Sequence, residues 1–216
     1  MSLFLFILNG FELAACIVGF LYWNKIKGTH WKWFPVYLAA IVLGEIAAEF
    51  FLHIKKDLAT NGAIYSYFVI PLEFFFFYWL FYRQFKHTKS SKWPLIAAAI
   101  YFVCLVADLL YINKIDFFFE SFSLVVGSLF FLVLLLIYFR KFMKSEEIVN
   151  YRSSMMFWVC LGLMIFYIGS MPFSAFRTFL WEKHNDLFYI YWYAQFILGY
   201  LMYSLFIVSF IWGKPK

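Results

Sequence analysis

The sequence predicts an all-α polytopic membrane protein in which residues 1–216 form a single domain, a bundle of seven transmembrane helices. Hydrophobic residues make up 65% of the chain and charged residues only 14%. A soluble domain of this length cannot bury so much apolar surface, whereas a bundle in a bilayer turns it towards lipid. The apolar residues form seven long runs, separated by short polar segments.

The runs have the length and pattern of helices. Each holds about 20 residues, the number that a helix needs to cross the apolar part of a bilayer. They lack strict alternation and are about twice as long as the strands of a membrane barrel. In order, the predicted spans are Leu3–Trp23, Phe34–His53, Tyr65–Phe85, Pro94–Ile112, Phe117–Phe139, Met155–Arg177 and Leu187–Trp212.

Basic residues predict the orientation of the bundle. Thirteen of the 18 Lys and Arg follow the first, third, fifth and seventh spans, and five lie on the other side. Because cytoplasmic loops are rich in Lys and Arg, we expect the N-terminus outside and the C-terminus in the cytoplasm. The expected location is the cell membrane, with the lipid bilayer as partner. This topology explains the net charge of +6 without nucleic-acid binding.

The first span is expected to remain in the protein as a helix. No basic segment precedes it and no small-residue cleavage site follows it, unlike a secretory signal peptide. The cysteines Cys16, Cys104 and Cys160 lie within apolar runs, and their spacing fits neither a metal site nor a disulfide framework. We expect them to be buried packing residues.

Aromatic residues flank the spans, as expected at membrane interfaces. Those predicted to anchor the inner interface are Trp23, Trp31, Trp33, Trp93 and Trp212. Those predicted to anchor the outer interface are Trp181, Tyr189 and Tyr191.

Acidic residues inside the spans are the candidate functional residues. Each costs a few kcal/mol in the bilayer unless it is paired or hydrated, so each is expected to face the interior of the bundle. In the predicted topology these acids, with other polar residues, lie in the outer part of the spans. The predicted pocket for a ligand or a proton comprises Asn9, Glu12, Glu45, Glu49, His53, Glu73, Asp108, Glu120, Arg177 and Gln195.

Spacing places some of these side chains together. Glu45 and Glu49 are four residues apart and share one face of a helix. Glu45 and Glu73 lie near the middle of their spans and are expected to form the bottom of the pocket. Arg177 and His53 are the expected internal counter-charges. The alternative is that these residues form structural ion pairs and hydrogen bonds that tie the helices together.

Two prolines interrupt the apolar runs. Pro71 lies two residues before Glu73, and Pro172 follows Gly169 and Ser170. Proline removes one backbone hydrogen bond from a helix and can kink it. Both prolines are predicted hinges, and a static bend is the alternative.

Motifs of soluble enzymes are missing from the sequence. It contains no HExxH, no GxSxG and no Gly-rich phosphate loop. Glu49 and His53, four residues apart, supply at most half of a metal site. Seven-span hydrolases use several membrane histidines, and retinal proteins use a lysine within the last span; this sequence has neither. We therefore expect no cofactor and no metal, and we favour a role without catalysis.

Two segments resemble a known class of membrane proteins. FWVCLGLMIFYIGSMPF, from Phe157 to Phe173, and YWYAQFILGYLMYSLFIVSFIW, in the last span, are similar to small bacterial seven-span proteins. These are the membrane sensor regions that feed histidine kinases. The resemblance implies a sensor whose output passes through a separate cytoplasmic signalling protein.

Three functions remain open from the sequence. The leading hypothesis is a receptor-like or sensor-like bundle with an outward-open acidic pocket for a polar or cationic ligand, or a proton. The first alternative is a small-solute or ion transporter coupled through the same carboxylates. The second is a membrane-embedded hydrolase around Glu49 and His53. A structural subunit of a larger complex is a further alternative.

Overall fold

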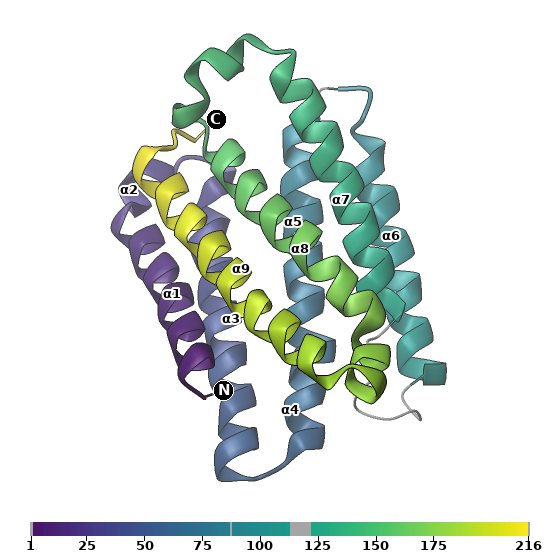
Figure 1. The fold of residues 1–216 in the computed structure, drawn as a ribbon. Coiled ribbons are helices and arrows are strands. Elements are labelled where there is room, and N and C mark those ends of the chain that lie inside the picture. The colour runs from purple at the N-terminus through teal and green to yellow at the C-terminus, as the bar shows by residue number, and fades with distance from the viewer. Residues whose placement is uncertain (1, 87, 113–121, 216) are drawn as a thin grey trace.

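The computed structural model describes residues 2–86, 88–112 and 122–215. Within these residues the long elements are all helices (Figure 1). In chain order they are α1 (Ser2–Leu21), α2 (Trp23–Ile26), η1 (His30–Lys32), α3 (Trp33–Glu49), η2 (Phe50–Ile54), α4 (Leu58–Ile64), η3 (Tyr65–Val69), α5 (Ile70–Phe85), α6 (Lys92–Ala107), η4 (Asp108–Ile112), α7 (Phe122–Met143), η5 (Glu146–Ser153), α8 (Met155–Lys183) and α9 (Asn185–Trp212).

Among the described residues, seven helical segments are long and apolar enough to cross a membrane, which confirms the predicted helical membrane fold. They are Leu3–Leu21, His30–Ile54, Leu58–Phe85, Lys92–Leu110, Phe122–Met143, Met155–Ser174 and Asn185–Trp212. The third begins seven residues before the predicted start at Tyr65, because the polar residues of α4 continue directly into the apolar helix. The predicted start of the fifth, Phe117, lies outside the described residues.

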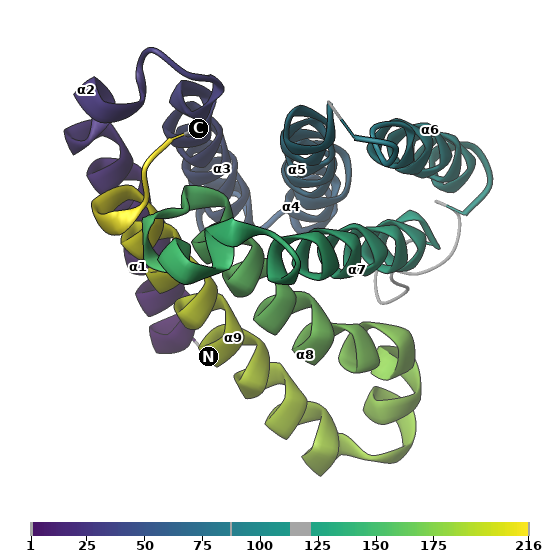
Figure 2. The same ribbon diagram turned by 90° about the horizontal axis from the view of Figure 1, so that it is seen from above.

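Successive spans run in opposite directions, and the two ends of the chain lie at opposite ends of the bundle (Figure 1). We call the end that holds Ser2 and the turn between η2 and α4 the N-terminal end. The opposite end, where α9 finishes, is the C-terminal end. Seen from above, α1, α3 and α9 lie on one side and α5, α6 and α7 on the other, with α8 between them (Figure 2). Which end faces the cytoplasm stays a prediction.

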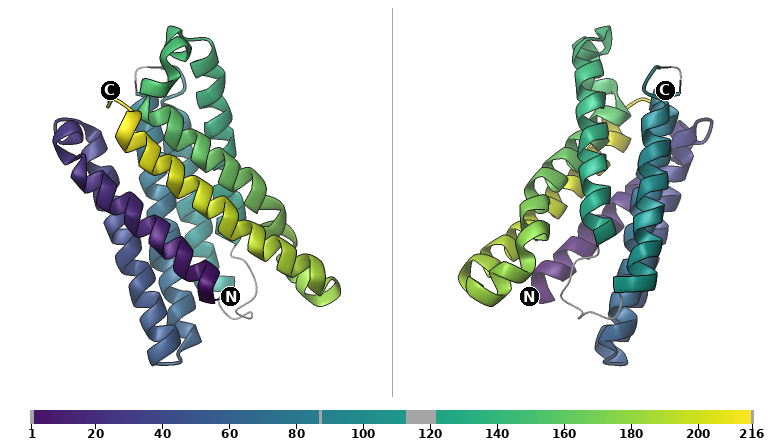
Figure 3. Two further views of the ribbon diagram at one scale, coloured as in Figure 1. Left: turned by 60° about the vertical axis from the view of Figure 1, so that its left-hand side comes forward. Right: turned by 90° about the vertical axis from the view of Figure 1, so that its right-hand side faces the viewer.

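Glycines bring α8 and α9 close together. A Cβ atom at Gly162 would lie 3.2 Å from the backbone oxygen of Met202, and one at Gly169 would lie 2.5 Å from the Leu198 side chain. Small residues allow this close approach of helices within a membrane. Towards the N-terminal end the α8–α9 pair leans away from α4 (Figure 3).

Aromatic side chains fill the bundle on the C-terminal side of mid-span. Phe34 is fully buried, with its ring centroid 5.2 Å from that of Phe206 and 5.1 Å from that of Phe210. Tyr37 stacks on Phe76 at 4.2 Å. We call these five residues the aromatic core. Their rings fill the space between α3, α5 and α9 on that side of the carboxyl-bearing turns.

Buried residues bear on two predictions. The three cysteines are buried and free, as expected. Trp31 is only 2% exposed and packs edge-on to Phe34, so its ring faces the bundle, and its role as an interface anchor stays a prediction. The short η1 helix turns this ring into the bundle, and sequence position alone carries no sign of that turn.

In the part of the chain that the structure describes, three spans contain a π-helical turn, η2, η3 and η4, each in the part of the span nearest the N-terminal end. A π turn leaves one residue out of the regular ladder and is frequent at functional sites. The turn of η3 directly precedes Pro71, whose ring would clash with a regular preceding turn. By contrast, α8 continues through Pro172 to Lys183. Whether either proline acts as a hinge stays a prediction.

Contacts at the C-terminal end join distant parts of the chain. The Lys25 ammonium, just after α1, donates to the carbonyl oxygens of Phe210 and Ile211 at 2.8 and 3.0 Å. These carbonyls belong to the last turn of α9, where helix carbonyls need donors. The Lys214 amide then donates to the Ser153 carbonyl at 2.7 Å. The end of α9 is therefore tied to both α2 and η5.

Candidate functional site

The first buried acid pairs with a tyrosine from the far end of the chain. Glu12 lies in the middle of α1 and is 2% exposed. The Tyr203 hydroxyl, on α9, donates a hydrogen bond to its carboxylate. A carboxyl group at this depth requires such a partner. The bond joins the first and last spans.

Two further acids are held in the same way. Glu45, on α3, accepts a hydrogen bond of 2.7 Å from the Tyr65 hydroxyl at the start of η3. Glu73, on α5, accepts one of 3.1 Å from the Tyr167 hydroxyl on α8. Each of the three bonds therefore links two helices.

The three carboxyl groups lie within electrostatic range of one another. Glu12 interacts with both Glu45 and Glu73, and Glu45 interacts with Glu73. The buried ring of Tyr37 adjoins the group and interacts with Glu12 and Glu73. We call Glu12, Glu45 and Glu73 the carboxyl cluster. It combines carboxylates from three spans, each near the middle of its span.

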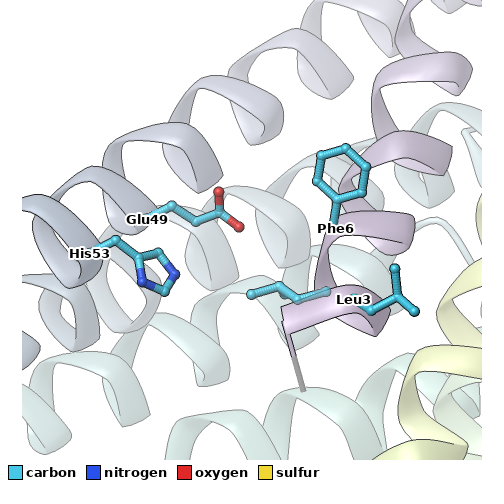
Figure 4. A pocket seen from close by; sticks show the side chains of 5 residues that line it. Leu3, Phe6, Glu49 and His53 are labelled. Carbon is cyan, nitrogen blue, oxygen red and sulfur yellow. The ribbon is translucent and has the colours of Figure 1, made fainter.

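A groove opens at the N-terminal end of the bundle, between α1 and the end of the second span (Figure 4). Its volume is about 410 Å³, and its polar lining comes from Glu49 and His53. Apolar side chains of α1, including Leu3 and Phe6, form the facing wall. The groove presents a carboxylate and an imidazole on successive turns.

Glu49 connects this groove to the carboxyl cluster. Its carboxylate accepts a hydrogen bond of 2.6 Å from the Asn9 side-chain amide on α1. It also interacts electrostatically with Glu45, one turn closer to the centre of the span. Polar groups therefore follow one another from the groove to mid-span: His53, Glu49 with Asn9, Glu45, and then Glu12 and Glu73.

Four of the ten predicted pocket residues do not belong to this series: Asp108, Glu120, Arg177 and Gln195. Asp108 is buried at the start of η4, where one carboxylate oxygen accepts the Ser123 backbone amide at 2.8 Å. It therefore joins the end of the fourth span to the start of the fifth, and interacts electrostatically with Tyr101 of α6. Glu120 lies outside the described residues.

Arg177 and Gln195 lie on the α8–α9 pair. The Arg177 guanidinium stands over the rings of Trp192 and Phe173, at 5.3 and 5.9 Å from their centroids. The Gln195 amide nitrogen is buried and makes no hydrogen bond within the described residues. The role of Arg177 as counter-charge to the acids stays a prediction.

Sequence reasoning missed the tyrosines. Tyr37, Tyr65, Tyr167 and Tyr203 face the acids from four different segments. Tyrosine usually lies at the membrane interface, so a tyrosine well inside a span is a signal that calls for a polar partner. Two of these four, Tyr167 and Tyr203, lie well inside the predicted spans and carried that signal, whereas Tyr37 and Tyr65 lie near the predicted span starts.

The chemistry available to the site is uptake of a proton or a small cation. Ionised carboxylates are costly in the bilayer, and either a bound proton or a bound cation removes that cost. Within the described part of the chain, no three His, Cys, Asp or Glu side chains group as a metal site requires. Comparisons with protein-family models, curated proteins and solved structures find no match for this chain.

Proposed function

We propose that this protein is a receptor-like or sensor-like membrane protein whose carboxyl cluster takes up a proton or a small cation from the N-terminal end. One observation carries the proposal. The carboxyl cluster is linked through Glu49 to an open groove at that end, and the aromatic core fills the bundle on its other side. A site with access from one side can sense the medium there.

The aromatic core favours a receptor over a transporter. Transport requires that a bound ion reach both sides at different times. Here Phe34, Phe206 and Phe210 pack between the carboxyl cluster and the C-terminal end. Interior side chains pack as closely as in an organic crystal, so an ion cannot pass without a large rearrangement.

The proposed output runs through the helices that the acids join. When Glu12 binds a proton or a cation, its carboxylate loses its net negative charge. The hydrogen bond from the Tyr203 hydroxyl then weakens, and the contact between α1 and α9 changes. At the C-terminal end, α9 contacts Lys25 and the residues beside η5. A cytoplasmic signalling protein that reads this end agrees with the positive-inside prediction and with the resemblance to kinase-associated sensor regions.

The test is a measurement of coupling between the two ends. The purified protein is placed in lipid nanodiscs, and hydrogen exchange of residues 146–153 is followed from pH 5.5 to 8 and with 0–200 mM Na⁺. We expect a several-fold change in exchange rate, after correction for intrinsic rates. Glu12→Gln and Glu73→Gln, which keep the side-chain volume, are expected to reduce it to a small fraction.

A matched control and a flux assay complete this test. Glu182→Gln removes an exposed carboxylate at the N-terminal end and should leave the response unchanged. If the combined variant of Glu12, Glu45 and Glu73 responds like the wild type, the proposal is wrong. Gradient-driven flux of Na⁺ or protons in proteoliposomes, abolished by Glu73→Gln, would instead identify a transporter.

A further inference from the structure

A second cleft lies at the opposite end of the bundle from the groove, between the end of α5, the end of α7 and η5. Its volume is about 150 Å³. The cleft is lined by polar and charged side chains, among them Gln84, Thr88, Tyr138, Lys141 and Glu147. None of them belongs to the carboxyl cluster or to its groove.

Lys141 presents a positioned positive charge in this cleft. Its ammonium donates to the Thr88 hydroxyl oxygen at 2.8 Å and stands 4.6 Å from the centroid of the Phe85 ring. An ammonium has three N–H donors, so two remain beyond the bond to Thr88. The contacts fix the charge at the wall of the cleft and leave donors for a ligand.

Tyr138 adds a buried donor. Its side chain is 3% exposed, and its hydroxyl lies within reach of the Ser154 side chain. A tyrosine hydroxyl can both donate and accept, so Tyr138 can donate to a ligand oxygen in the cleft while it accepts from Ser154. Tyr138 lines the same cleft as Lys141, one helical turn away.

The level of the cleft indicates where its ligand comes from. The third span ends at Phe85 and the fifth at Met143, so the cleft lies where lipid headgroups meet the bundle. On the same helix, Leu136 and Met143 are 60% and 62% exposed and offer an apolar surface to acyl chains. Basic pockets between helices at the cytoplasmic interface bind anionic headgroups.

We propose that this cleft binds the phosphodiester headgroup of an anionic glycerophospholipid, with Lys141 and Tyr138 as donors to the phosphate oxygens. A phosphodiester carries one negative charge, which one lysine matches. Glu147 lines the cleft as well. Its carboxylate repels a dianion such as inorganic phosphate more strongly than it repels a monoanion. The proposal is independent of the carboxyl cluster.

The experiment is native mass spectrometry of the purified full chain, delipidated in detergent and titrated with a short-chain phosphatidylglycerol. We expect one tightly retained lipid on the wild type. Lys141→Gln should weaken retention about tenfold and Tyr138→Phe about threefold, whereas Glu147→Gln should strengthen it. Lys144→Gln, which removes an exposed lysine outside the cleft, is the matched control and should change nothing.

Two outcomes would overturn the proposal. Equal losses for Lys141→Gln and Lys144→Gln would mean diffuse attraction to the basic end of the bundle. Displacement of phosphatidylglycerol by millimolar inorganic phosphate would mean that the cleft selects free phosphate rather than a lipid. Thermal unfolding of each variant shows that it is folded, and Tyr138→Phe, which removes only one oxygen, keeps the test decisive if Lys141→Gln is unstable.

Discussion

The Tyr167 hydroxyl of α8 donates a hydrogen bond of 3.1 Å to the Glu73 carboxylate of α5, across 94 residues of sequence. Tyr203 holds Glu12 in the same way across 191 residues. In both pairs an acid that the bilayer disfavours is stabilised by a donor from a distant span. The acids therefore serve the packing of the bundle as well as the proposed site.

Tyr167→Phe is expected to destabilise the protein by about 0.5–2 kcal/mol, because it removes the donor and leaves the Glu73 carboxyl group without its phenol partner. The measurement is reversible unfolding in detergent micelles. Tyr189→Phe, which removes a hydroxyl from an exposed side chain on α9, is the control and should be neutral. A Tyr167→Phe protein as stable as the wild type would show that this bond contributes nothing.

A second prediction concerns the turn at the N-terminal end. Asp57 caps α4: its carboxylate accepts the Thr60 amide at 3.0 Å and the Thr60 hydroxyl at 2.6 Å. These hydrogen bonds, the one from the Thr60 hydroxyl first, lower the pKa of Asp57. Because the folded pKa lies below the unfolded value of about 3.9, the cap contributes fully above that value. The contribution disappears as the pH falls through the folded pKa.

Hydrogen exchange of residues 58–64 measures this cap. Asp57→Ala should lower the protection of these amides at pH 6, and the difference from wild type should disappear as the acid is protonated. Asp57→Asn keeps a neutral acceptor, so its protection should not depend on pH. A difference between wild type and Asp57→Ala that does not decrease as the pH is lowered from 6 through the folded pKa of Asp57 would contradict the assignment of the cap.

A third prediction concerns the end of α9. A Cβ atom at Gly213 would lie 2.4 Å from the Ser209 carbonyl oxygen and 2.7 Å from the Met155 Cα atom, and neither backbone atom can move alone. Gly213→Ala should therefore destabilise the protein by about 1–3 kcal/mol, as overpacking does. Gly10→Ala is the control, because nothing lies within 4 Å of its Cβ position and alanine favours the helix. Equal thermal midpoints for the two variants would contradict this account.

The sequence predicted the spans well, because span formation depends on apolar length alone. It also placed Glu45 and Glu49 on one face of a helix, since four-residue spacing fixes that face. The tertiary pairing of Glu12 with Tyr203 could not be derived, because it depends on which distant helices become neighbours. The π turns were equally out of reach, since a change in backbone hydrogen-bond register has no mark in composition.

The orientation of the bundle is the prediction on which the direction of sensing depends. The native cysteines are buried, so a membrane-impermeant maleimide should report only on an introduced cysteine. Lys55→Cys lies in the exposed turn at the N-terminal end and Lys89→Cys in the exposed loop at the C-terminal end. In intact cells we expect Lys55→Cys to react at once and Lys89→Cys to react only after permeabilisation, because the loop of Lys89 belongs to the basic side. The reverse pattern would place the groove of Glu49 and His53 in the cytoplasm, and the proposed sensor would then respond to the cell interior.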